Sequence, residues 1–223
     1  MLRLSALALA GLLPFCAQAA PVDILFVGNS YTFGRVDPVM SYNSANVTDL
    51  TSPERGGTFT DTTGSHAFEP HPWGGVAGIF KKLTDQAGLD YNVSLSTRNA
   101  ASLRGHLLNT SPAGWDLRGN LTQQTWDKVV LQEQSANSLA RQTNAQGLDN
   151  GADPEGFRYY ANAMKNLLQT GQTGVLRDRD AFDGATSAER QAACEATGTA
   201  AGTCSRNRGE YTNANASEDT EVY

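Results

Sequence analysis

Histidine and cysteine are scarce in this sequence, which has three of each among 223 residues. The histidines are His66, His71 and His106, and none follows residue 106. His66 and His71 are five positions apart with Glu69 as the nearby carboxylate, a pattern that gives little support for a zinc site. The sequence therefore predicts no metal site, and nothing in it indicates a cofactor.

Clusters of basic residues are absent as well. Acidic residues outnumber lysine and arginine by 23 to 17, and the formal net charge is −6. This balance argues against a nucleic-acid partner and against an anionic membrane surface. No stretch after the N-terminal segment is apolar enough for stable membrane insertion. The composition does not indicate an oligomeric state.

The N-terminal segment has the three parts of a secretory signal peptide. A short basic start ends at Arg3, residues 4–15 are mostly apolar, and Ala17-Gln18-Ala19 is a small-x-small cleavage signal. We predict that residues 1–19 are removed by cleavage after Ala19 and that the protein is secreted or periplasmic. Cys16 leaves with the signal peptide. The remaining pair, Cys194 and Cys204, is expected to form a disulfide in an oxidising compartment.

Strand and helix signals alternate through the rest of the chain. Residues 22–27 are almost all apolar, as in a strand covered on both faces. Further strands are expected at residues 91–96 and 129–131, and helices at 76–87 and from Asp153-Pro154-Glu155 onward. This order predicts a flavodoxin-like three-layer αβα fold with a mostly parallel sheet. We expect residues 20–223 to form one α/β domain.

Residues 34–72 interrupt this alternation. The segment is polar, rich in Thr, Ser, Asn and Gly, and has no sustained hydrophobic period. A structureless run of this length is unusual inside a compact domain. We interpret it as an insertion, either a substrate-binding lid or a surface loop without a role.

Three polar motifs follow three of the predicted strands. The first is Gly-Asn-Ser-Tyr-Thr at residues 28–32, the second is Asn99 to His106, and the third is Gln-Glu-Gln-Ser at residues 132–135. The carboxyl ends of parallel strands form the ligand-binding edge of an open α/β sheet, so the motifs are expected to meet there. A simpler interpretation of the first motif is that Ser30 only caps the next helix.

Together the motifs resemble those of the SGNH (GDSL-like) hydrolases, in a secreted subgroup with Gly-Asn-Ser and Val-Val-Leu-Gln-Glu-Gln-Ser blocks. The resemblance covers roughly residues 22–168. It implies that Ser30 is the nucleophile, and that the N–H groups of Ser30 and Ala100 hold the oxyanion. The side-chain amide of Gln132, Gln134 or Asn137 would add a further donor. Asn99 and Ala100 depart from the family pattern, which has glycines there.

Asn29, Tyr31 and His106 are the candidates for contacts with a substrate. His106 has an alternative interpretation as a satisfied core histidine or one on a helix surface. The family's catalytic base is a histidine three residues after an aspartate late in the chain, and no Asp-x-x-His occurs in this sequence. Residues 220–223 look like the start of a strand. We therefore expect that the sequence stops before a last strand, the catalytic dyad and a last helix.

The resemblance implies a secreted serine esterase acting on a carbohydrate or small-molecule ester, with an acetyl ester as the preferred guess. His66 and His71 remain possible substitute bases, although their flexible setting does not predict the orientation that a base requires. The second function class is a non-catalytic extracellular module that binds a glycan at the same edge of the sheet.

Overall fold

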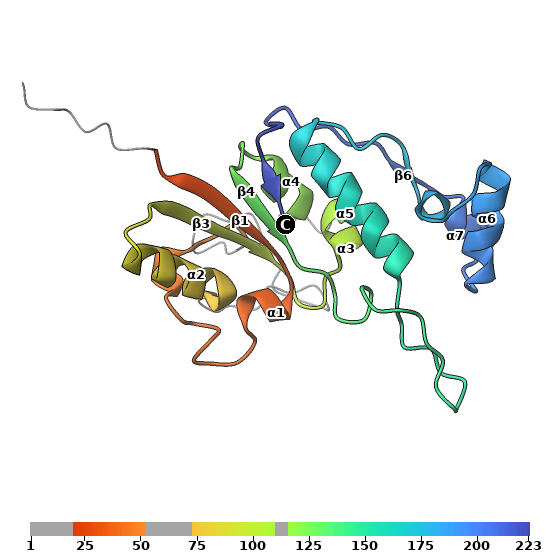
Figure 1. Cartoon of the computed structure of the whole chain (residues 1–223), viewed down its shortest axis with the longest axis horizontal. Coiled ribbons are helices and arrows are strands. Elements are labelled where there is room, and N and C mark those ends of the chain that lie inside the picture. The colour runs from red at the N-terminus through yellow and green to blue at the C-terminus, as the bar shows by residue number, and fades with distance from the viewer. Residues whose placement is uncertain (1–19, 52–72, 110–115) are drawn as a thin grey trace, which may run out of the picture.

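The computed structural model describes residues 20–51, 73–109 and 116–223 (Figure 1). The predicted signal peptide, His66 and His71 lie outside these ranges, as does the second half of the predicted insertion. Within the described ranges, no helix has the length and apolar character needed to cross a membrane.

The core of the fold is a five-stranded sheet in the order β2-β3-β1-β4-β7, with every pair parallel. The chain runs from β1 to β3 on one side and then returns to place β4 on the other side of β1. This reversal makes the gap between β1 and β4 a topological switch point, where open α/β sheets bind ligands. The strands are β1 (Val22–Gly28), β2 (Thr48–Asp49), β3 (Tyr91–Thr97), β4 (Lys128–Leu131) and β7 (Glu221–Val222).

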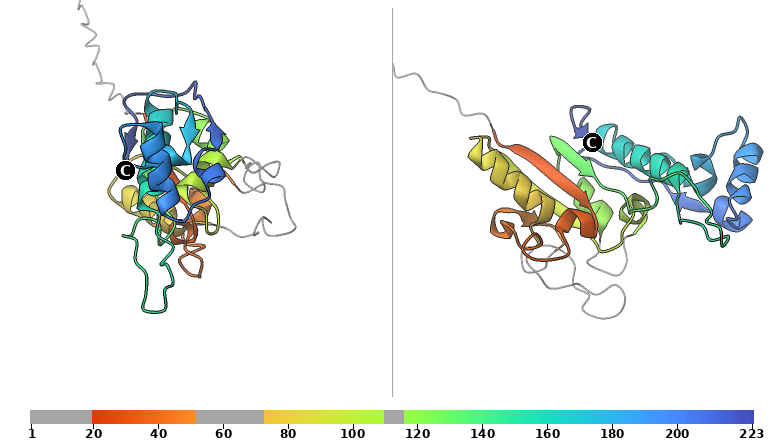
Figure 2. Two further views of the ribbon diagram at one scale, coloured as in Figure 1. Left: turned by 90° about the vertical axis from the view of Figure 1, so that its right-hand side faces the viewer. Right: turned by 60° about the horizontal axis from the view of Figure 1, so that its bottom comes forward.

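Helices cover both faces of this sheet, an arrangement compatible with three layers (Figure 2). Successive side chains of β1 enter different cores: Ile24 packs beside Phe33 and Trp73, whereas Leu25 packs with the helices of the opposite face. The α/β class and the parallel sheet predicted from the sequence are therefore confirmed. One face carries α1 (Ser30–Phe33) and α2 (Gly75–Gln86), and the other carries α3 (Leu103–Leu108), α4 (Leu117–Thr122) and α5 (Pro154–Gln169).

The helices predicted at residues 76–87 and from Asp153 onward are confirmed as α2 and α5, and α2 buries mainly small residues. Asp153 caps α5 by accepting a hydrogen bond from Gly156 N at 3.3 Å, with Pro154 in the first turn. In α2, however, Ile79 and Leu83 are exposed, and small residues face the protein. Gly78 is required there because a Cβ would lie 2.1 Å from the Tyr42 carbonyl oxygen.

The described part of the 34–72 segment is tied into the fold. It contains a 3-10 turn, η1 (Ser44–Asn46), and β2, which pairs with β3 through Thr48 and Ser94. The Asn43 side chain donates a hydrogen bond to Gly78 O at 3.0 Å and so attaches the segment to α2. No hydrophobic pattern in this segment predicts β2.

Residues 178–206 form a projection at one end of the molecule, called the disulfide arm here (Figure 1). Cys194 and Cys204 form the predicted disulfide, which joins its two helices. Thr186 and Glu189 make a capping box at the start of the first of these helices. The arm contains η4 (Asp178–Ala181), α6 (Ser187–Ala196) and α7 (Ala201–Cys204), and its base is flanked by β5 (Leu176–Arg177) and β6 (Asn207–Gly209).

Candidate functional site

The turn after β1 places Ser30 at the carboxyl end of the central strand. Ser30 is the first residue of α1. The helix cap is Asn29, whose Oδ1 accepts a hydrogen bond from Tyr31 N at 3.1 Å. Asn29 Nδ2 also donates to Ala101 O at 3.0 Å, and only 1% of Asn29 is exposed. Ser30 is therefore not the cap. Asn29 is used in holding the turn and offers almost no surface to a substrate.

Gln132, directly after β4, forms hydrogen bonds to the same turn. Its Oε1 accepts hydrogen bonds from Asn29 N and from Thr32 Oγ1, both at 2.9 Å. A Cβ on Gly28 would lie 2.6 Å from this oxygen, so glycine lets the turn and the side chain approach. Gln132 Nε2 donates to Glu133 O. Because the oxygen faces the turn and the nitrogen is engaged elsewhere, Gln132 fits a positioning role better than that of an oxyanion donor.

Glu133 links the loop after β4 to the start of α3. Its Oε1 accepts hydrogen bonds from Gln134 N at 2.6 Å, Asn137 Nδ2 at 3.1 Å and Leu103 N at 3.3 Å. Burial raises the pKa of this carboxyl, and the hydrogen bonds oppose the rise. The Asn137 amide is thus already used. Of the three candidate amides, only the Gln134 side chain makes no hydrogen bond within the described part of the chain.

Ala100 occupies the loop after β3 with a φ of +57°, in the left-handed region that favours glycine. The alanine thus adopts a conformation typical of glycine. Ala100 is exposed, and the turn is closed by a hydrogen bond from Ala101 N to Arg98 O at 3.2 Å. Among the described residues, the Ala100 N–H has no hydrogen-bond acceptor.

Three side chains therefore join the three loops at the carboxyl edge of the sheet. Asn29 reaches the loop after β3, Gln132 reaches the turn after β1, and Glu133 reaches α3. We call residues 28–32, 98–103 and 132–137 the carboxyl-edge loops. Within the described ranges, neither the hydroxyl nor the N–H of Ser30 makes a hydrogen bond. The loops thus present a hydroxyl and unused N–H donors, while Tyr31, 65% exposed, stands beside them.

His106 lies beneath these loops and has no exposed surface. Its Nε2 is 2.8 Å from Gly28 O, and since a carbonyl oxygen only accepts, Nε2 carries the hydrogen. Burial lowers the pKa of His106 to about 4, so the ring is neutral near pH 7. His106 supports the Ser30 turn from below and does not line an accessible site. Its alternative interpretation as a core histidine fits this position, but only one of its two ring nitrogens is satisfied, because the buried Nδ1 makes no hydrogen bond among the described residues.

The sequence motifs lie on the strand ends that meet in the structure, but they do not indicate the roles of two residues in this arrangement. Thr32 and Glu133 both lie inside the quoted motifs, and only their contacts show what they do. His106 is the only histidine within the described ranges, and its Nε2 is bonded to Gly28 O. No group of three His, Cys, Asp or Glu side chains suited to a metal ion occurs among the described residues.

Comparisons of the chain with protein-family models, with curated proteins and with solved structures found no match.

Proposed function

We propose that this protein is a secreted serine ester hydrolase of the SGNH type, with Ser30 as its nucleophile. The supporting observation is the Ser30 hydroxyl, which lies at the switch point after β1 and makes no hydrogen bond within the described part of the chain. The substrate class is a carbohydrate or small-molecule acyl ester, in particular an acetyl ester.

In the proposed reaction, Ser30 Oγ attacks the acyl carbon and its proton passes to a base. The carbonyl oxygen becomes an oxyanion, for which the N–H groups of Ser30 and Ala100 and the Gln134 amide are the proposed donors. Such donors are effective because they are already oriented where the negative charge develops. The alcohol then leaves with a proton, and water releases the acid from the serine.

The base is not His106, which is fully buried and bonded to Gly28 O. The proposal therefore assigns the base to a residue outside the described ranges. In the family that the motifs resemble it belongs to an Asp-x-x-His motif, which this sequence lacks. The test uses the full-length protein.

A location outside the cytoplasm is part of the proposal. The signal-like residues 1–19 suggest export, and the Cys194–Cys204 disulfide is chemically suited to an oxidising compartment.

The test measures hydrolysis of a chromogenic acetyl ester and of an acetylated sugar. Ser30→Ala should lower kcat by about 10⁴-fold or more, because no other group replaces the nucleophile. Ser205→Ala, an exposed serine on the disulfide arm, is the matched control and should keep the full rate. A fluorophosphonate probe should label Ser30 as shown by peptide mass. Turnover that survives Ser30→Ala, or a label on another serine, would overturn the assignment.

A non-catalytic glycan-binding module is the second candidate. Tyr31 favours it, because an exposed aromatic ring beside hydrogen-bonding groups can pack against the C–H face of a sugar. For this candidate, the complete protein should bind an acylated glycan without cleaving it, and Tyr31→Ala should weaken binding.

A further inference from the structure

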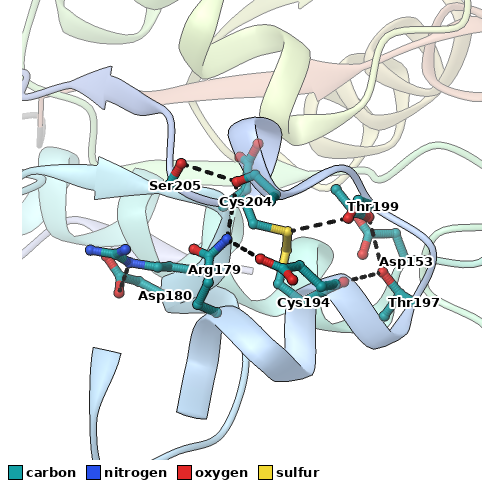
Figure 3. The surroundings of a disulfide bond; sticks show 12 residues. Asp153, Arg179, Asp180, Cys194, Thr197, Thr199, Cys204 and Ser205 are labelled. Atoms are coloured by element: carbon teal, nitrogen blue, oxygen red, sulfur yellow. Dashed lines mark hydrogen bonds and ion pairs between the residues drawn. A yellow bond between two sulfur atoms is a disulfide. The ribbon is translucent and has the colours of Figure 1, made fainter. Parts of the chain in front are cut away.

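A cavity lies between the disulfide arm and the start of α5, with a volume of about 320 Å³. This volume is in the range of small-molecule binding sites. Arg104 on α3 and Asp178 on η4 contribute to its wall, together with Phe182 and Thr203 of the arm. Figure 3 shows the disulfide that holds this side of the arm. The cavity adjoins the carboxyl-edge loops through α3, because Leu103, the residue before Arg104, donates to Glu133.

The charged groups around the cavity compensate one another. The Asp178 carboxylate accepts hydrogen bonds from Arg104 Nη2 at 3.3 Å, Arg208 Nε at 3.1 Å and the Tyr160 hydroxyl at 2.6 Å. Arg141, which also lines the cavity, pairs with Asp153 at 3.0 Å and with Glu155 at 2.8 Å. Three guanidinium groups thus meet three carboxylates. A ligand with a net charge would gain no net attraction from this set and would lose its hydration.

Polar groups with capacity for a ligand remain in the wall. A guanidinium has five N–H donors, and the interactions of Arg104 with Asp178 and Tyr160 do not use all of them. The Thr203 hydroxyl makes no hydrogen bond among the described residues, and Thr199 Oγ1 bonds only to Thr197 Oγ1, at 2.9 Å, within the same ranges. Hydroxyls both donate and accept, so they match a ligand whose own groups do the same.

The wall also has an apolar side, formed by Phe182 and by Cys194 of the disulfide. A sugar ring combines the two properties required here: several neighbouring hydroxyls at its edge and an uncharged C–H face. A guanidinium can donate two parallel N–H bonds to adjacent oxygens, which suits vicinal hydroxyls.

We propose that this cavity is a binding subsite for one uncharged sugar residue. Arg104 and Thr203 hydrogen-bond its hydroxyls, and Phe182 packs against its C–H face. The subsite goes beyond the proposed hydrolysis and does not require it, since none of these three residues belongs to the Ser30 machinery.

The test measures binding of methyl glycosides of glucose, galactose, mannose and xylose to the complete protein by saturation-transfer NMR and calorimetry. All binding is measured in the Ser30→Ala background, so that loss of hydrolysis and loss of sugar binding are scored separately. At least one neutral glycoside should bind with a Kd of about 1 mM or lower. Glucuronate and glucosamine, the charged analogues of similar size, should bind more weakly.

Two wall variants locate the site. Arg104→Met keeps the length of the side chain but removes its donors, and should raise Kd by about tenfold or more, a change of at least ~1.4 kcal/mol. Thr203→Val keeps the shape of the side chain but removes its hydroxyl, and should raise Kd by a few-fold. Their matched controls are Arg206→Met and Thr212→Val at exposed positions outside the cavity wall.

Three results would overturn the proposal. The first is no glycoside binding at about 50 mM, a concentration at which a Kd of about 1 mM would give near saturation. The others are equal binding of glycoside by the wild type and the wall variants, and tighter binding of a charged analogue than of the neutral glycosides. Glycoside binding that depends on Arg104 and Thr203 would support it, even in a protein that hydrolyses no ester.

Discussion

The carboxyl-edge loops and the disulfide arm are held in place by different means. In the loops, the side chains of Asn29, Gln132 and Glu133 bind backbone groups of neighbouring loops. In residues 182–206, by contrast, the only buried residues are Cys194 and Cys204. Strands already bring the loops together, so hydrogen bonds suffice to fix them. The arm has little apolar surface to bury, and a covalent bond takes the place of a core.

Of the changes considered, removal of the disulfide should change the relative stability of the arm and the loops most. Closing a loop of this length stabilises by about 3 kcal/mol on the chain-entropy model. Double replacement of Cys194 and Cys204 by alanine should therefore open the arm, while the sheet keeps its protection. Amide hydrogen exchange resolved by peptide measures both regions at once. Equal loss of protection in β1 would mean that arm and sheet unfold as one unit. It would contradict the statement that the disulfide stabilises the arm alone.

Acid should act on the loops instead, through His106. Its pKa is about 4 in the folded protein and near 6.5 when unfolded, so the unfolded state binds the proton first. The stability that the neutral ring contributes is fully present when the pH is above the pKa of the unfolded state. It is lost as the pH falls toward 4. The expected loss is about 2 kcal/mol between about pH 7 and about pH 4.5.

Urea unfolding at the two pH values measures this loss, and His106→Gln is the informative variant. Glutamine can still donate to Gly28 O but does not titrate. The raised pKa of Glu133 acts in the opposite direction, adding stability as pH falls, and it is present in both proteins. The difference between them isolates His106. An equal pH dependence in the wild type and the variant would exclude this account.

Ala100→Gly should give the smallest effect, and it should be stabilising. A left-handed conformation costs an alanine about 1–2 kcal/mol, whereas glycine loses about 0.4–1 kcal/mol through its more flexible unfolded state. The net gain is about 0.5–1 kcal/mol in the unfolding free energy. Ala101→Gly is the control and should be destabilising, since Ala101 does not have a positive φ. A loss of stability in Ala100→Gly would show that the loop is not strained.

Local signals explain what the sequence predicted correctly. A few residues close together in the sequence are enough to indicate each of these features: the apolar strands, the Asp153 cap and the cysteine pair. The box formed by Thr186 and Glu189 is equally local and could have located α6. β2 has only two residues and exists through its pairing with β3, so no local period indicates it.

The chemistry of the edge was harder to predict, because it depends on contacts between distant residues. Gln132 is 103 positions from Asn29, and only their contact shows that its oxygen, rather than its nitrogen, faces the turn. Likewise, the depth at which His106 is buried depends on helices that pack over it. Sequence motifs identified the loops that meet, while the orientation of each side chain came from the packing.

The edge strand β2 also bears on how copies of this protein behave beside one another. It ends the strand order among the described residues, and its Asp49 points inward with 1% exposed. The carboxylate accepts hydrogen bonds from Thr51 N at 2.9 Å and Thr51 Oγ1 at 2.7 Å. A two-residue edge that carries an inward acid is a poor template for a strand from another molecule. β2 and the Asp49–Thr51 turn that follows it thereby disfavour edge-to-edge aggregation at high concentration.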